Sequence, residues 1–177
     1  MLAAEAPSDG AVAVNALTEV DVLAALDDVP DPEIPAISVV DLGVIGRIEA
    51  GTPGGTLRVE LLPTFVGCPA LDPMREAVAR RLRAIAPDRS VEVTITYAPP
   101  WTADRITPRG RARLTASGFA PPAAVRPVDV LTLDAAVACP FCGSTRTVLD
   151  NPFGPTPCRS IRYCTSCRQP FEHFKAV

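Results

Sequence analysis

The chain has 177 residues, 47% hydrophobic and 21% charged, which is enough to fold as one ordinary domain with a small additional module. Its formal net charge of −3 argues against a general nucleic-acid binder. No stretch approaches the roughly 18 apolar residues of a membrane span, and the N-terminus lacks the basic start of a signal peptide. We therefore expect a cytoplasmic protein that binds neither a membrane nor nucleic acid.

The charges are distributed unevenly along the chain. Residues 1–71 hold two Arg against eleven Asp and Glu, whereas residues 72–118 hold nine Arg against five Asp and Glu. One acidic and one basic surface would follow if the fold kept these segments apart. Such a pair of surfaces suits a protein partner better than DNA.

Hydrophobic periodicity predicts the first elements in chain order. Residues 1–16 are Ala-rich and lack a helix cap, so we expect them to be loose. Helical spacing predicts a helix over about 18–28, and the prolines of "VPDPEIP" predict a rigid, extended loop after it. Alternating apolar residues then predict two strands, within 38–51 and 56–64, joined as a hairpin by the turn "TPGG".

The same domain continues with a helix, a strand and a helix. Residues 68–87 have an amphipathic helical pattern, with most of their Arg residues on the solvent side. Residues 90–101 alternate and predict a third strand, which the prolines end, and a short helix is expected over about 107–117. This order predicts an α+β domain over residues 17–118, a small three-stranded sheet covered by helices. A Pro- and Ala-rich linker is expected over 119–138.

Five of the six cysteines lie in the last forty residues. Two CxxC pairs, Cys139 with Cys142 and Cys164 with Cys167, offer the four thiolates of a tetrahedral zinc site. The residues between the pairs predict strand, turn and strand. We therefore expect a zinc-ribbon-like module over 139–177, which is too small to fold without its metal. Four thiolates also bind iron or an iron–sulfur cluster, so iron stays an alternative to zinc.

Two other residues of this module lie outside the CxxC pairs. Cys158 is expected to be a small, half-buried filler, and the alternative is a role in exchanging ligands or binding a cluster. His173 follows a complete set of four cysteines, so we expect it at the surface or in packing rather than as a ligand.

Cys68 lies alone between the second predicted strand and the helix that follows. Either Cys68 itself or Asp72 would cap this helix. In both cases the thiol is near the helix N-terminus, where free N–H groups and the dipole would stabilise a thiolate and lower its pKa. The alternative is a buried, inert thiol that fills a strand–helix junction. No His, Lys or second Cys is nearby in the sequence to complete a catalytic pair.

A few further residues are weaker candidates for a functional site. Asp31 and Glu33 lie in the rigid "DPEIP" loop, and acidic residues in such a loop are more often ordinary surface residues than functional ones. We expect Asp41 to cap a turn and Trp101 to cover the core. The sequence contains no P-loop, Rossmann glycine pattern, HExxH motif or nucleophile elbow.

Several of these segments together resemble known families. "DPEIPAISVVDLGVIGRIE", "PTFVGCPA" and "VTITYAPPWTADRITPRGRARL", in that order, resemble the small domain of iron–sulfur assembly proteins of the SufT and MIP-eighteen type. The tail "CPFCGS…FGPTPCRSIRYCTSCRQPFEHFK" resembles that of PaaD-type (PaaJ) subunits of the phenylacetate-CoA oxygenase, the 1,2-phenylacetyl-CoA epoxidase. The resemblance covers about residues 18–175, both domains and their order.

The resemblance implies a non-catalytic accessory or maturation subunit in aerobic phenylacetate degradation. There, a di-iron oxygenase epoxidises phenylacetyl-CoA with electrons from a reductase that carries flavin and a [2Fe–2S] cluster. The chain would assist assembly of the iron–sulfur or iron centre in these subunits, together with the iron–sulfur assembly machinery. By resemblance, Cys68 would contact a transient cluster, with Asp31 and Glu33 in the neighbouring motif. The metal ligands of the tail would be Cys139, Cys142, Cys164 and Cys167.

Two functions of other classes stay open at this point. The chain could be a structural scaffold that docks the oxygenase and the reductase together. It could also be a redox protein that relays electrons through iron at the four-cysteine site.

Overall fold

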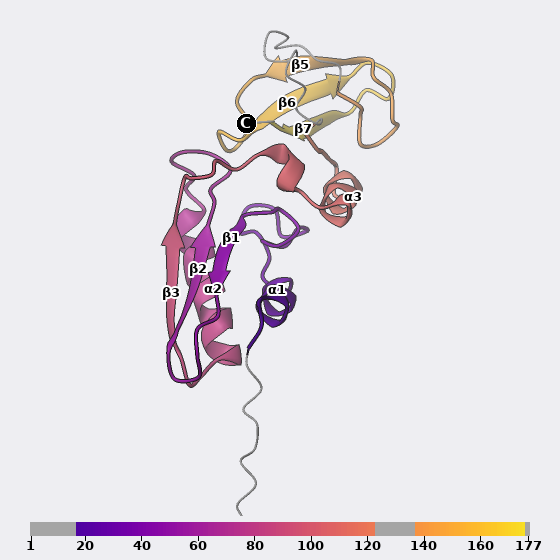
Figure 1. Ribbon diagram of the computed structural model, residues 1–177. Coiled ribbons are helices and arrows are strands. Elements are labelled where there is room, and N and C mark those ends of the chain that lie inside the picture. The colour runs from indigo at the N-terminus through magenta and orange to yellow at the C-terminus, as the bar shows by residue number, and fades with distance from the viewer. Residues whose placement is uncertain (1–16, 123–136, 176–177) are drawn as a thin grey trace, which may run out of the picture.

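The computed structural model describes residues 17–122 and 137–175, which form two sheets (Figure 1). The predicted loose segment 1–16 lies outside the described residues. The first sheet is the predicted three-stranded one, and the second belongs to the cysteine-rich module.

The first sheet has the strand order β1–β2–β3. Strands β1 (Ile45–Glu49) and β2 (Thr56–Leu61) form the predicted antiparallel hairpin. Strand β3 (Ser90–Ile95) pairs in parallel with β2. The helix between them returns the chain to the end of the sheet where β2 began, so that β3 runs in the same direction. The pairing of β1 with β2 shifts register between Ile45 and Ile48, where Gly46 lies close to Glu60.

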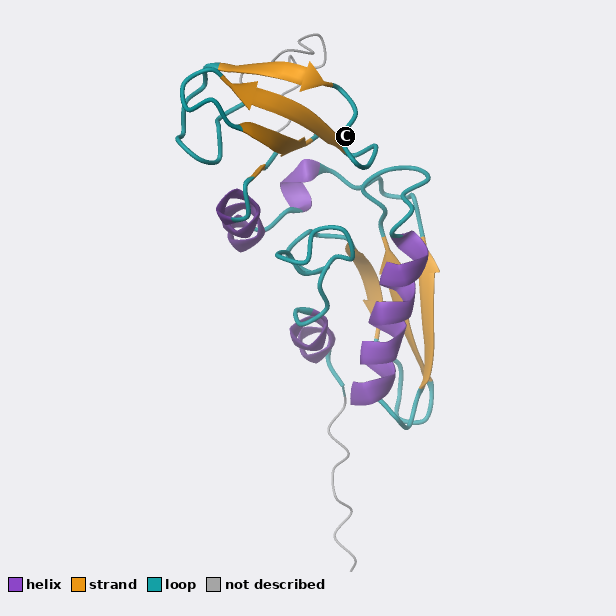
Figure 2. Ribbon diagram, turned by 180° about the vertical axis from the view of Figure 1, so that it is seen from behind, coloured by secondary structure: helices purple, strands orange, loops and turns teal. Residues whose placement is uncertain are grey.

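Helix α2 (Leu71–Ile85) covers one face of this sheet (Figures 1 and 2). It buries Met74, Val78 and Leu82, as its amphipathic pattern predicts. On β3 half-buried residues alternate with exposed ones, so the other face of this strand is open to solvent.

Two shorter helices flank this layer. Helix α1 (Glu19–Leu26) begins with a capping box, in which Thr18 Oγ accepts the Asp21 N–H and Asp21 accepts the Thr18 N–H. A single 3₁₀ turn, η1 (Ala103–Arg105), precedes helix α3 (Pro108–Ala116). The side chain of Thr107 caps α3 by accepting the Gly110 N–H.

The second sheet has the order β4–β7–β6–β5. Three of its strands come from the cysteine-rich module: β5 (Thr147–Asn151), β6 (Arg159–Cys164) and β7 (Pro170–Phe174). The fourth, β4 (Phe119–Ala120), lies in the segment predicted as a linker and pairs in parallel with β7. Residues 123–136 of that segment lie outside the described residues.

The two modules share one hydrophobic core. Phe174 and Cys158, both from the second module, belong to the cluster of buried residues that fills the first. The Phe174 ring lies 5.9 Å from the Trp101 ring, centroid to centroid, and Trp101 Nε1 donates to the Leu42 carbonyl oxygen (3.0 Å). Trp101 thus covers the core, as expected, and it is itself covered by Phe174 of the second module rather than exposed to solvent.

Ion pairs join the acidic N-terminal part of the chain to the arginines that follow it. Arg81 of α2 pairs with Asp28 (2.8 Å), and Arg109 of α3 pairs with Asp27. These contacts bring parts of the two oppositely charged segments together.

Asp41 makes the most extensive of these contacts. It is fully buried and accepts hydrogen bonds from Thr107 Oγ1 (2.6 Å), Arg109 Nε (2.9 Å) and Arg113 Nη1 (2.9 Å). Burial alone would raise the pKa of this carboxyl, but these donors outweigh it and hold the pKa below its usual range. Asp41 was expected to cap a turn, but Ser38 does so instead, since Ser38 Oγ accepts the Asp41 N–H. The Asp41 carboxylate fastens this loop to α3.

Candidate functional site

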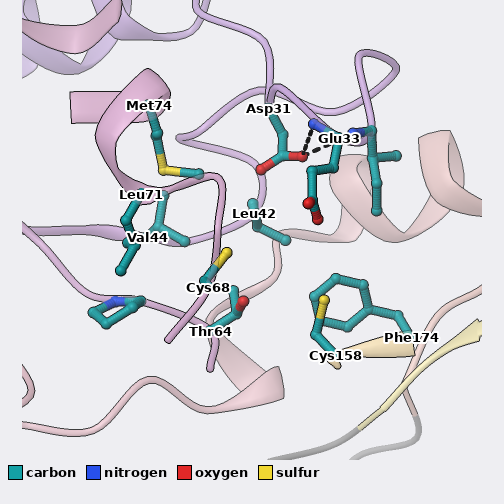
Figure 3. Close-up of a pocket in the computed structure, with 12 residues that line it drawn as sticks. Asp31, Glu33, Leu42, Val44, Thr64, Cys68, Leu71, Met74, Cys158 and Phe174 are labelled. Carbon is teal, nitrogen blue, oxygen red and sulfur yellow. Dashed lines mark hydrogen bonds between the residues drawn. The ribbon is translucent and has the colours of Figure 1, made fainter. Parts of the chain in front are cut away.

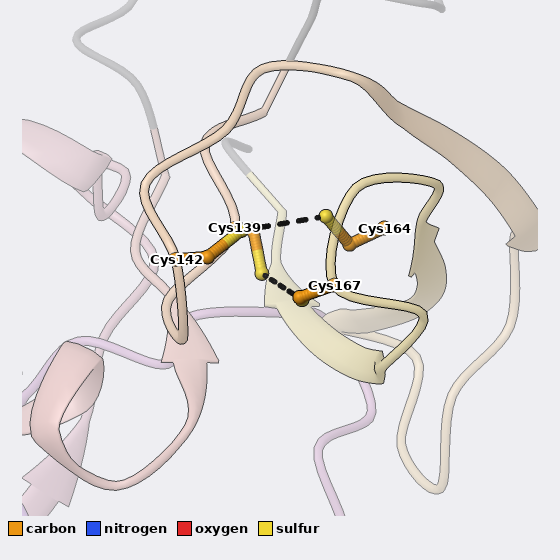
Figure 4. A group of neighbouring side chains, drawn as sticks. All are labelled: Cys139, Cys142, Cys164 and Cys167. Carbon is orange, nitrogen blue, oxygen red and sulfur yellow. Dashed lines mark hydrogen bonds between the residues drawn. The ribbon is translucent and has the colours of Figure 1, made fainter.

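The four cysteines of the CxxC pairs converge at one end of the second sheet (Figure 4). Their sulfur atoms all lie within 4.8 Å of one another. The Sγ atoms of Cys139 and Cys167 are 3.6 Å apart, as are those of Cys142 and Cys164. A tetrahedral zinc ion with Zn–S bonds of about 2.3 Å needs sulfurs about 3.8 Å apart. The four thiols therefore fit a tetrahedral metal ion.

Two equivalent turns present these sulfurs. In the first, the Gly143 N–H donates to the Cys139 carbonyl oxygen (2.8 Å), and in the second the Arg168 N–H donates to that of Cys164 (2.9 Å). Both residues have positive φ, 70° and 60°, so the second turn accepts an arginine where the first has glycine. Backbone N–H groups of Cys167 and Ser166 lower the pKa of Cys164 to about 6, whereas burial and the neighbouring sulfurs raise the pKa of Cys167 to about 12.

Among the described residues, the sulfur group leaves out His173 and Cys158. His173 is half-buried beside Ser160 Oγ (3.4 Å), and burial, with the nearby Arg162 and Lys175, lowers its pKa to about 4. Of the two places expected for His173, the surface or the packed interior, the structure has the second.

Cys68 lies in the loop between β2 and α2. The helix begins at Leu71 with Ala70 as its N-cap, so neither Cys68 nor Asp72 caps it. The predicted lowering of the Cys68 pKa is also wrong. Partial burial raises this pKa and the acidic Glu33 raises it further, while the Ala70 N–H opposes them too weakly. The thiol lies before the first turn of the helix, and its burial outweighs the N–H group of Ala70.

The "DPEIP" loop supplies those carboxylates. Asp31 Oδ1 accepts the N–H groups of Glu33 (2.9 Å) and Ile34 (2.8 Å), which fixes the loop in a tight turn. Asp31 is only 5% exposed, and its burial raises its pKa despite these two bonds. Glu33 is half-buried, and its Oε2 lies 3.7 Å from Arg159 Nη2 of the second module.

Cys68, Asp31 and Glu33 line a single cavity of about 20 Å³ (Figure 3). The structure thus brings together the three residues that the resemblance singled out. Cys158 and Phe174 of the second module line the same cavity. Cys158 was missed as a partner of Cys68, since only the docking of the two modules makes them neighbours.

Two family models match separate parts of the chain. Residues 19–95 match the family model described as "Iron-sulfur cluster assembly protein", and residues 124–175 match the "PaaD zinc beta ribbon domain". One subunit of the "Putative 1,2-phenylacetyl-CoA epoxidase" of Escherichia coli is 35% identical over 89% of this chain and 92% of its own length. The chain belongs to the PaaD family.

Other relatives of this PaaD-family chain match its first module alone. An "Fe-S protein maturation auxiliary factor" of Porphyromonas gingivalis is 33% identical over 51% of this chain and 84% of its own length. The same kind of factor in Bacillus subtilis, YitW, is 29% identical over 49% of this chain and 83% of its own length.

A solved structure matches the same part of the chain. The crystal structure of a DUF59 domain of unknown function from Bacillus anthracis has a TM-score of 0.50 and 26% identity. The match covers 54% of this chain and 90% of that one. Within residues 17–122 and 137–175, no helix is long and apolar enough to cross a membrane.

Proposed function

We propose that this PaaD-family chain is a non-catalytic accessory subunit of a cytoplasmic 1,2-phenylacetyl-CoA epoxidase. It assists the assembly of the iron–sulfur or iron centre in the oxygenase or reductase subunit, together with the iron–sulfur assembly machinery. One observation carries the proposal: an iron–sulfur assembly module, with Cys68, Asp31 and Glu33 around one cavity, is joined to a PaaD zinc ribbon.

The chemistry of the cavity suits transient contact with iron. Thiolates are soft ligands that bind iron and iron–sulfur clusters, and carboxylates are ligands of iron in many proteins. Cys68 is half-buried, so its sulfur can meet a centre carried by a partner subunit. Because its pKa is raised, the empty thiol stays neutral, and it gives up its proton when it takes a metal.

The four-cysteine site has a structural role in this proposal, with zinc as its metal. A closed set of four thiolates is typical of structural zinc sites, and two of the four residues, Cys139 and Cys164, are buried. The metal joins the turn before β5 to the turn between β6 and β7. It thereby holds β7 so that Phe174 enters the shared core.

Cluster occupancy of the partner reductase tests the function. The reductase is produced together with the wild-type chain, with Cys68→Ser or with no chain, and its iron and acid-labile sulfide are measured. We expect Cys68→Ser to leave the reductase as poorly loaded as omission of the chain does. Val66→Ser is the matched control, since Val66 lies in the same loop and is 74% exposed. Full cluster occupancy with Cys68→Ser would favour a scaffold instead.

A further inference from the structure

Strand β3 forms one edge of the first sheet, and no strand lies on its outer side in the part of the chain that the structure describes. The N–H groups of Ser90 and Thr96 donate to the carbonyl oxygens of Gly55 and Leu61 (3.0 and 2.9 Å). Successive residues of a strand direct their backbone groups to opposite sides, so the residues at odd positions between these two face away from β2. They are Val91, Val93 and Ile95.

This edge lacks the features that usually prevent edge strands from pairing, which are bulges, prolines and unpaired charges. All six residues of β3 pair with β2 in one continuous register. The only charged residue of β3 is Glu92, which forms an ion pair with Arg58 (2.9 Å). By contrast, the register of β1 at the opposite edge shifts after Ile45. Of the two edges of this sheet, β3 is therefore the one suited to accept a further strand.

The side chains of β3 divide between the two faces of the sheet. The valines and the isoleucine lie on the face that α2 covers but are only half-buried, because nothing described covers them from the open edge. Ser90, Glu92 and Thr94 are exposed on the other face. A strand about 4.8 Å away would complete the burial of the apolar side chains and pair the outward backbone groups.

We propose that the β3 edges of two copies of this chain pair antiparallel about a two-fold axis at Val93. The inference is independent of the proposed function, since it concerns neither the cavity nor the four-cysteine site. In this register Val91 meets Ile95 of the second copy, Val93 meets its own equivalent, and each such pair exchanges both backbone hydrogen bonds. On the exposed face Glu92 meets Thr94 of the second copy, so no like charges lie opposite each other.

The sequence around β3 favours an axis at Val93. Pro87 and Pro99 each lie six residues from Val93, and neither has an N–H group, so they limit the paired segment equally on both sides of the axis. An axis at Glu92 would place two carboxylates directly opposite each other, which is destabilising. An axis at Thr94 would extend the pairing past the end of β3. The axis at Val93 avoids both problems.

Charges on α2 favour a second copy as the occupant of this edge. Arg81 Nε donates to a carbonyl oxygen of α1 (3.0 Å), which lies on the β1 side of the sheet (Figure 1). Arg83 is about 200° further round the helix, so it lies on the side of the β3 edge, where it is exposed and forms no ion pair with the described residues.

The start of α2 offers the opposite charge on the same side of the helix. Asp72 and Glu76 precede Arg83 by eleven and seven residues, a spacing that places all three along one side. Asp72 already pairs with Arg75 (3.0 Å), whereas Glu76 is exposed and has no partner among the described residues. The two-fold axis makes the two α2 helices antiparallel, so Arg83 of each copy faces the acidic start of the other.

The mass of the full, zinc-loaded chain in solution tests the interface. Sedimentation equilibrium is measured over a range of concentrations, and we expect the wild-type mass to approach twice the 18.6 kDa of one chain. Thr94→Glu places a like charge opposite Glu92 of the second copy, whereas Thr94→Lys places an opposite charge there. Because the axis makes each pair twice, we expect the dimer dissociation constant to rise about 2- to 30-fold in Thr94→Glu and to fall by a similar factor in Thr94→Lys.

Two more variants distinguish the β3 edge from a general effect of charge. Thr115→Glu adds the same charge at an exposed position of α3 and should keep the wild-type constant. Val93→Pro removes the N–H group at the axis, which faces away from β2, and should leave the chain monomeric. Circular dichroism and Trp101 fluorescence show whether each variant is folded.

Two results would overturn the proposal. A wild-type chain that stays monomeric at millimolar concentration would leave the β3 edge to a strand of another protein. A dimer with the same dissociation constant in Val93→Pro and in both Thr94 variants would have its interface elsewhere.

Discussion

Replacing Phe174 by alanine would remove the side chain through which the zinc ribbon enters the core of the first module. Phe174 is 2% exposed and lies in the same buried cluster as Trp101 and Leu42. If the two modules form one cooperative unit, this substitution destabilises both of them. If they fold separately, it affects the ribbon alone.

The expected magnitude follows from the burial. Truncation of a fully buried Phe to Ala costs about 3–5 kcal/mol in free energy of unfolding, cavity included. The lost aromatic pair with Trp101 contributes about 0.5–1.5 kcal/mol of this. With an m-value of about 2 kcal/mol per M urea, the unfolding midpoint falls by about 1.5–2.5 M.

The chain contains a single tryptophan, so the fluorescence of Trp101 reports on this interface directly. Urea unfolding is followed by Trp101 fluorescence and by far-UV circular dichroism. We expect Phe174→Ala to shift the native emission to the red and to lower the midpoint equally by both probes. The control is Phe153→Ala in the same module, where the ring is 70% exposed. An unchanged Trp101 spectrum and midpoint in Phe174→Ala would refute the shared core.

Two further predictions concern Asp41 and the four-cysteine site. Asp41→Asn removes charge-assisted hydrogen bonds from Thr107, Arg109 and Arg113, so we expect a loss of about 2–3 kcal/mol in urea unfolding at pH 7. Because the folded pKa of Asp41 lies below its unfolded value, its contribution is present above about pH 4 and is lost as the pH falls through the folded pKa. The difference between wild type and Asp41→Asn should therefore shrink in acid, and a constant difference from pH 7 to pH 3 would contradict this assignment. Cys164→Ser should abolish binding of the one metal ion per chain and shift Trp101 emission to the red, whereas Cys158→Ser should keep the metal. Retention of the metal by Cys164→Ser would show that the ligand set is wrong.

Local signals predicted much of the fold. Some signals depend only on residues close in the sequence: the Thr18 cap, the apolar face of α2 and the alternation in β2. The structure has each of these features at the residues where the sequence predicts it. The CxxC pairs are similar, since each pair forms its own turn. Their spacing alone was therefore enough to predict which four thiols come together.

The remaining features depend on contacts between distant parts of the chain. The raised pKa of Cys68 comes from burial and from Glu33, which the fold brings to it from the preceding loop. Asp41 meets Arg109 and Arg113 only when α3 packs beside its turn. Cys158 and Cys68 come to line one cavity only at the module junction. Neither residue propensities nor motif spacing can predict contacts between such distant residues. Only the resemblance pointed to the cavity, and it named Cys68, Asp31 and Glu33 but not Cys158.

Reconstitution of the purified reductase tests the central claim most directly. Cluster-free reductase is supplied with Fe²⁺ and sulfide without oxygen, and the growth of its visible cluster absorption is timed with the chain, with Cys68→Ser and with no addition. The proposed function predicts faster cluster formation with the wild-type chain and none of this acceleration with Cys68→Ser. Equal rates in all three reactions would contradict a role in cluster assembly.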